Sequence, residues 1–251
     1  MMMHEGIVQN LERFNHFVSL GYSCYIAQNL QDMGLRNESL PFDWLASSLS
    51  GVLKAIETQF SDFLSYDLMY QDSKYHHAYK NIAYDFSFYH DCKKELPLRW
   101  QISSVRRKYA RRIARFYKVI QEPTLFIRYV RNWEELEWLE ENHKTVEELL
   151  KGYCAFNGIL YIFDIEESVV FDEKIPNLYH VKKDEGEKLT KKPIISNQIL
   201  YSAFEKLEYP NKEKNLSFYA NKKPKTTYRG KVEKKLRRVM KDYKHNKQMR
   251  I

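Results

Sequence analysis

Two short segments of the chain are almost entirely apolar, and they constrain the fold more than any other feature. Thr124–Val130 and Gly158–Asp164 are typical of strands buried on both faces of a sheet. We predict two further strands, at residues 15–20 and 177–181. Because helical patterns separate these segments, the sequence predicts βα units around a parallel sheet. The predicted fold class is therefore α/β, with a central, mostly parallel sheet and helices on both faces in three layers. The helical patterns cover residues 24–33, 50–60, 100–120, 132–151 and 199–207.

The charge distribution divides the chain into parts. Residues 211–251 carry a net charge of +12, whereas the rest of the chain carries −4, although the whole chain is at +8. We therefore predict a leader at residues 1–14, a single α/β domain at 15–207, and a basic linker and tail at 208–251. The pattern at 231–247 fits a basic helix. Three alternatives stay open for this tail: a solvated segment, a contact with an anionic membrane surface, or a contact with nucleic acid.

The cysteines and the apolar patterning indicate the compartment. Cys24, Cys92 and Cys154 are widely spaced and form no CxxC motif, which fits neither a disulfide framework nor a zinc site. Residues 1–10 lack the pattern of a signal peptide, and no run reaches the roughly 18 apolar residues of a membrane span. We predict a cytoplasmic, soluble protein with no transmembrane segment, no metal and no cofactor.

The segment Phe17–Cys24 is the strongest candidate for a chemical site. Its apolar run ends at Gly21, and a helical pattern starts directly after Cys24. This order predicts a strand, a tight turn and a helix with Cys24 in its first turn. The helix dipole there favours the thiolate, which is the nucleophilic form of cysteine. Gly21 permits a turn that lets the backbone approach a substrate closely. The alternative is a buried, unreactive cysteine.

Other polar residues lie at the ends of predicted strands. Arg128 and Arg131 follow one strand and Asp164 ends another, as the Gly21–Cys24 turn follows the first. Ligands of open α/β sheets bind beyond the carboxyl ends of the strands. We therefore predict one site at this edge of the sheet, in which Arg128 and Arg131 bind a phosphate or a carboxylate.

Two more segments carry candidate groups. Asp43 lies between Phe42 and Trp44, where a carboxylate either caps a helix or is buried with an altered pKa. His90 and Asp91 end a short extended segment, and histidine is the side chain best suited to act as a base near neutral pH.

Together these motifs resemble a known family. The pieces are Ser19-Leu20-Gly21-x-x-Cys24, Pro41-Phe42-Asp43-Trp44, Phe88-x-His90-Asp91, and a basic helix with Arg111-Arg112 before the strand Leu125–Arg128. Over residues 15–205 the chain resembles a bacterial family of papain-like cysteine peptidases of unknown function. The resemblance implies Cys24 as the nucleophile, His90 as its base, an acidic group that orients His90, and a peptide or small acyl or amide substrate. A papain-like α+β fold is the alternative fold.

The resemblance leaves the acidic group open. Asp91 adjoins His90, but neighbours on a strand point to opposite faces, which favours Asp43. The oxyanion donors would be the Cys24 N–H and Ser19 or Asn29. We assign substrate binding to Ser19, Gly21, Trp44, Arg128 and Arg131.

The leading functional prediction is a cysteine-dependent hydrolase, either a peptidase or an enzyme acting on amide or acyl bonds. A serine esterase using Ser19 or Ser23 is disfavoured because residues 160–210 lack an Asp-x-x-His motif. The third reading is a non-catalytic domain that binds a ligand or a cell-surface polysaccharide in the strand-end pocket.

Overall fold

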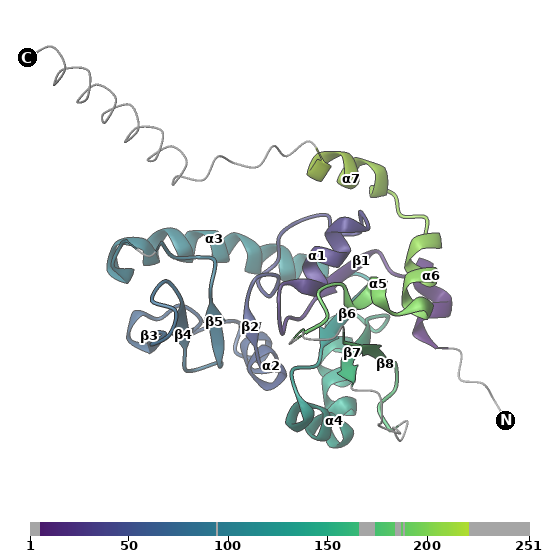
Figure 1. Ribbon diagram of the computed structural model, residues 1–251, viewed down its shortest axis with the longest axis horizontal. Coiled ribbons are helices and arrows are strands. Elements are labelled where there is room, and N and C mark those ends of the chain that lie inside the picture. Colours follow the sequence, from purple (N-terminus) through teal and green to yellow (C-terminus); the bar gives the residue numbers. More distant parts are fainter. Residues whose placement is uncertain (1–5, 94, 166–173, 184–186, 188, 221–251) are drawn as a thin grey trace, which may run out of the picture. The chain divides into compact units, whose positions relative to one another are not determined.

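A four-stranded parallel sheet forms the centre of the computed structural model, which describes residues 6–93, 95–165, 174–183, 187 and 189–220. Its strands are β1 (His16–Ser19), β6 (Thr124–Tyr129), β7 (Gly158–Ile165) and β8 (Leu178–Lys182). They lie in the order β1-β6-β7-β8, and every neighbouring pair is parallel (Figure 1). The predicted α/β fold with a mostly parallel sheet is confirmed, and the papain-like α+β alternative is not the one observed.

Helices cover both faces of this sheet. Alternate side chains of the central strand β6 point to opposite faces: Phe126 packs in one hydrophobic cluster, and Leu125 and Ile127 pack in the other. The Phe126 cluster includes side chains from α2 (Leu49–Glu57), α3 (Leu98–Val119) and α4 (Trp133–Lys151). The Leu125 cluster includes η1 (Ile7–Arg13), α1 (Tyr25–Asp32), α5 (Pro193–Ser196) and α6 (Gln198–Lys206). Ile7 and Leu11, expected in a leader, therefore belong to the core.

A second, antiparallel sheet is formed by segments between α1 and α3 in the sequence, and the sequence analysis did not predict it. It contains β2 (Ala46–Ser47), β3 (Met69–Gln71), β4 (Tyr79–Asn81) and β5 (Phe86–Phe88), in the order β2-β5-β4-β3, with η2 (Tyr66–Leu68) before β3. Only the segment around β5 had been expected to be extended. Strands of two or three residues are too short to give a clear alternation in the sequence.

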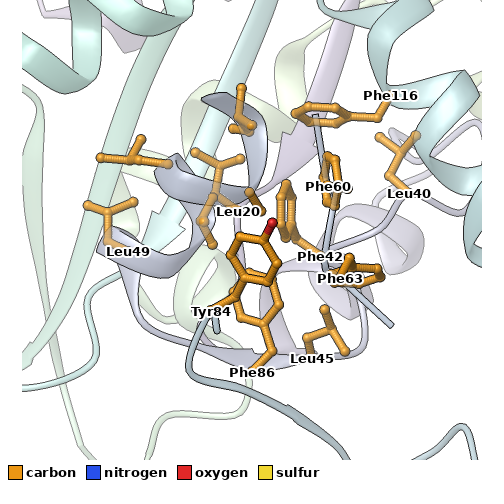
Figure 2. Close-up of a cluster of buried hydrophobic side chains, with 14 of the residues drawn as sticks. Leu20, Leu40, Phe42, Leu45, Leu49, Phe60, Phe63, Tyr84, Phe86 and Phe116 are labelled. Carbon is orange, nitrogen blue, oxygen red and sulfur yellow. The ribbon is translucent and has the colours of Figure 1, made fainter. Parts of the chain in front are cut away.

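An aromatic cluster holds the second sheet in place (Figure 2). Phe42 lies at its centre: its ring stacks on Phe60 at 5.5 Å between centroids and meets Phe116 edge-on at the same distance. Phe86 of β5 contacts the same ring at 6.0 Å. Aromatic pairs of this geometry contribute about 0.5–1.5 kcal/mol each beyond the area they bury. The segment that contains Asp43 and Trp44 is thus anchored in the core by Phe42.

The chain divides into two units at Asn215, and α7 (Lys212–Ala220) crosses this boundary. The described residues end at Ala220, so the basic helix predicted at 231–247 and most of the tail at 211–251 lie outside them. The contacts of this tail with a membrane or a nucleic acid stay predictions, as do the domain boundary at residue 207 and the cytoplasmic location. Within the described part of the chain, no helix is long and apolar enough to cross a membrane.

Candidate active site

The turn after β1 has the predicted strand–turn–helix form, and it is pressed against β2. Gly21 has φ +81°, and a Cβ at this position would lie 2.3 Å from the Ser47 Oγ. The Gly21 N–H donates to the Ser19 Oγ at 3.2 Å, and the Ser47 N–H donates to the Tyr22 carbonyl at 3.2 Å. Ser19 is buried. Gly21 and Ser19 therefore shape the turn, and the turn is joined directly to the antiparallel sheet.

Cys24 is the N-cap residue of α1, one position before the first helical turn in which the sequence pattern placed it. Its side chain is partly buried and makes no capping hydrogen bond. Burial raises the pKa of the Cys24 thiol above its ordinary value, and the residue's own backbone N–H opposes this only in part. The direction is opposite to the thiolate stabilisation expected from the helix dipole, so this conformation favours the neutral thiol.

His90 lies beside Trp44 because two strands pair. Trp44 precedes β2 and His90 follows β5, and these strands are antiparallel with Ala46 opposite Ser87. The two rings are perpendicular, with centroids 6.5 Å apart. His90 is exposed. Among the described residues, no hydrogen bond joins His90 to Cys24, Asp43 or Asp91.

Asp43 is buried in an ion pair that the sequence analysis missed. Its Oδ2 accepts from the Arg36 Nε at 3.0 Å, from the Arg36 Nη2 at 2.6 Å and from the Leu40 N–H at 2.9 Å. Burial raises the pKa of the Asp43 carboxyl, and the Arg36 charge opposes the rise. The structure thus fits the predicted buried carboxylate rather than a helix cap, since Ser48 caps α2. The signal available in the sequence was Arg36 itself, seven residues before Asp43.

Asp91 points towards α3, and its contacts there do not orient His90. Its carboxylate accepts from the Lys108 Nζ through one oxygen and from the Tyr109 hydroxyl through the other, the latter at 2.9 Å. The Asp91 side chain is only 3% exposed. The sequence argument against Asp91 as the orienting group therefore agrees with these contacts, and the Asp91 carboxylate instead ties the end of β5 to α3.

Arg128 is a structural brace in this conformation, which corrects its predicted role in binding substrate. Its side chain is fully buried, and all five of its N–H donors have partners within the protein. Both Glu135 oxygens accept from it, at 2.8 and 2.7 Å. The other three bonds reach the Leu20 carbonyl, the Ser47 hydroxyl and the Ser47 carbonyl. Arg128 therefore joins β6, α4, the end of β1 and β2, and it has no donor left for a ligand.

Arg131 is exposed, in contrast to Arg128. It forms an ion pair with Asp85 at 2.7 Å, and its guanidinium lies 6.0 Å from the centre of the Tyr22 ring. It also lines a surface hollow of about 310 Å³ together with Ser48, Ser50 and Trp138. This position leaves Arg131 accessible to a ligand, and the Tyr22 ring beside it belongs to the turn that leads to Cys24.

Two other candidates serve the structure. Asp164, at the C-terminal end of β7, accepts from the Thr190 N–H at 3.0 Å. Asn29 donates to the Lys191 carbonyl at 3.3 Å and accepts from the Ile194 N–H at 3.1 Å, so its amide is occupied and does not suit an oxyanion donor. The structure thus packs Trp44 against His90 and joins the Cys24 turn to β2 of the same sheet, and it leaves Arg128, Asp91 and Asn29 as supporting contacts.

The fold and the site define an α/β protein with a cysteine at a strand–turn–helix junction and a histidine on a neighbouring sheet. The sequence profile of the family described as "Putative papain-like cysteine peptidase (DUF1796)" matches residues 15–164. The chain belongs to this family, which confirms the predicted family over residues 15–164 but not its bacterial origin or the motif pattern that suggested it.

One relative is a viral protein. It is "Uncharacterized protein R408" of Acanthamoeba polyphaga mimivirus, 30% identical over 173 residues, which cover 58% of this chain and 76% of the viral protein. No solved structure matches the chain significantly.

Proposed function

We propose that this protein is a cysteine-dependent hydrolase that cleaves an amide or acyl bond, with peptides as the substrate class. Cys24 is the nucleophile and His90 is the base. The observation that carries the proposal is the convergence of distant segments: the Tyr22–Ser47 hydrogen bond joins the Cys24 turn to β2, and the β2–β5 pairing places His90 against Trp44. Membership of a peptidase-like family supports the same reaction class.

The raised pKa of Cys24 favours one order of events. Because burial raises the pKa of the Cys24 thiol and so favours its protonated form, His90 takes the thiol proton as the sulfur attacks the substrate carbonyl carbon. The Sγ–C bond forms, the C–N bond breaks, and His90 returns the proton to the leaving amine. Water then attacks the thioester carbon as His90 removes a proton from it, the Sγ–C bond breaks, and His90 returns the proton to the sulfur as the acid product leaves. The Cys24 N–H at the start of α1 is a donor for the oxyanion.

The test is capture of the acyl-enzyme. The protein is incubated with p-nitrophenyl esters of N-acylated amino acids and with a peptide-amide library, and intact and digested protein are analysed by mass spectrometry. We expect an acyl adduct on Cys24, none in Cys24→Ala, and formation slower by about 100-fold or more in His90→Gln. Cys92→Ala is the matched control and should behave as wild type. Equal acylation of Cys92 and Cys154, or no effect of His90→Gln, would contradict the proposal.

A non-catalytic binding domain is the second candidate, for example one that binds a cell-surface polysaccharide. The exposed Arg131 beside a hollow favours it, as does burial, which raises the pKa of the Cys24 thiol. Under this alternative, glycan binding survives Cys24→Ala and His90→Gln, and is weakened by Arg131→Met.

A further inference from the structure

A chain of contacts runs from Asp43 to His90. The Arg36 guanidinium is held by Asp43 on one side and lies 5.4 Å from the centre of the Trp44 ring on the other. Trp44 in turn contacts the His90 ring at right angles. The two charged side chains are 6% and 3% exposed, so water does not screen their attraction. A continuous series of contacts, which we call the stack, therefore runs from the interior to the surface through Asp43, Arg36, Trp44 and His90.

Both ends of the buried pair are fixed. Arg36 Nη2 donates to the Ser39 Oγ at 2.8 Å, and Nη1 donates to the Gln31 Oε1 at 3.3 Å, on α1. Asp43 accepts from the Leu40 N–H, and its neighbour Phe42 is locked in the aromatic core. The guanidinium plane therefore has little freedom. The stack connects α1, the helix that Cys24 caps, to the ring of the candidate base.

We propose that Arg36 and Asp43 are positioning residues that act on His90 through Trp44. This inference rests on the proposed function, because His90 needs a fixed orientation only if it acts as a base. Asp43 and Asp91 make no hydrogen bond with His90 among the described residues. Asp43 orients the guanidinium, the guanidinium fixes the Trp44 ring by a cation–π contact, and the Trp44 ring limits the rotation of the imidazole.

The physical basis is the fork geometry of arginine. A guanidinium can bind a carboxylate through two N–H groups and also lie flat on an aromatic ring, which a lysine ammonium does not reproduce. Arg36→Lys therefore retains the positive charge beside Asp43 but loses the plane that fixes Trp44. Arg36→Lys therefore distinguishes a role of Arg36 in positioning Trp44 from a role in neutralising the Asp43 charge.

The experiment follows the ring carbons and protons of His90 by NMR in the full-length protein, with the signal assigned from His90→Gln. We expect Arg36→Lys and Trp44→Ala to shift the His90 signal and to narrow it, as the ring gains mobility. Trp44→Phe restores part of the wild-type position. Trp100→Ala, which removes a tryptophan that is 67% exposed, is the control and leaves the His90 signal unchanged. Thermal unfolding shows that each variant is folded, and the Trp44 variants keep the test decisive if Arg36→Lys does not fold.

The outcomes distinguish the positioning role of Arg36 and Asp43 from the proposed role of His90 as a base. Turnover, or acylation of Cys24, should fall about 10- to 100-fold in Arg36→Lys and Trp44→Ala through kcat rather than KM. A His90 signal that stays in the wild-type position in Trp44→Ala, or in a folded Arg36→Lys, overturns the positioning role even if His90→Gln abolishes acylation. A signal that moves in both variants, while His90→Gln leaves acylation unchanged, supports the stack and refutes the proposed base.

Discussion

The buried pair of Arg128 and Glu135 gives the sharpest prediction about stability. Arg128 is fully buried and the Glu135 side chain is 8% exposed, so removing one partner leaves an uncompensated charge in a dry site. Breaking such a pair costs about 3–5 kcal/mol. We expect Arg128→Met to lower the free energy of unfolding by about 4 kcal/mol. For a unit of this size that corresponds to a fall in Tm of about 8–16 °C.

The double variant tests whether the pair is the cause. Glu135→Leu alone should cost about 4 kcal/mol for the same reason, so independent effects would sum to about 8 kcal/mol. Arg128→Met/Glu135→Leu removes both charges and should cost about 5 kcal/mol, which is a coupling of about 3 kcal/mol. The Leu20 and Ser47 carbonyls and the Leu49 N–H remain without these partners, which is why the double variant does not regain wild-type stability.

The measurement is guanidinium unfolding followed by circular dichroism and tryptophan fluorescence. Arg131→Met is the matched control: it is the same substitution three residues further on, in an exposed pair with Asp85, and should cost less than about 1 kcal/mol. A loss below about 1 kcal/mol in Arg128→Met would refute the buried brace. If that variant kept its stability but lost ligand binding, the original assignment of Arg128 to substrate would be restored.

Two further predictions concern the turn and a second cysteine. Gly21→Ala should lower the free energy of unfolding by about 2 kcal/mol or more, because φ is +81° and the new Cβ would meet the Ser47 Oγ. Thermal unfolding measures this loss of stability. An unchanged Tm would contradict the close approach of Gly21 to Ser47. Burial and then the Asp91 charge raise the pKa of Cys92 to about 11. The unfolded chain loses this proton near pH 8.5, so the Cys92 contribution to stability is complete below that pH and is lost as pH rises towards 11. Cys92→Ala should therefore flatten the decline of Tm between pH 8.5 and 11, and equal slopes would refute this.

The parallel sheet could be predicted because its residues obey a single rule. The strands of a sheet covered on both faces need apolar side chains on both sides, and Thr124–Val130 and Gly158–Asp164 have them. Arg128 is the charged residue within Thr124–Val130, and its presence there carries information. An arginine in a strand buried on both faces needs a partner for its charge, and Glu135, seven residues later, was available at the start of the next helix. The prediction that Arg128 binds substrate at the carboxyl ends of the strands overlooked this requirement.

The antiparallel sheet could not be predicted in the same way. Its strands have two or three residues each, and its order depends on contacts between segments far apart, such as Ser47 with Tyr22. Those contacts also set the position of His90, which is why the motifs named the candidate nucleophile and base but not their geometry.

The sequence-based prediction and the structure differ in how an acidic residue would act on His90. The sequence argument treated the choice as one between Asp43 and Asp91, on the assumption that a carboxylate contacts the base directly. The structure gives each carboxylate a cationic partner, Arg36 or Lys108, and the contacts of Asp91 with described residues lead to α3 and not to the His90 ring. Of these two carboxylates, Asp43 is the one that described side chains, Arg36 and Trp44, connect to His90. In the proposed positioning role the two aromatic neighbours of Asp43 therefore differ: Phe42 anchors the segment in the core, and Trp44 links the buried pair to His90.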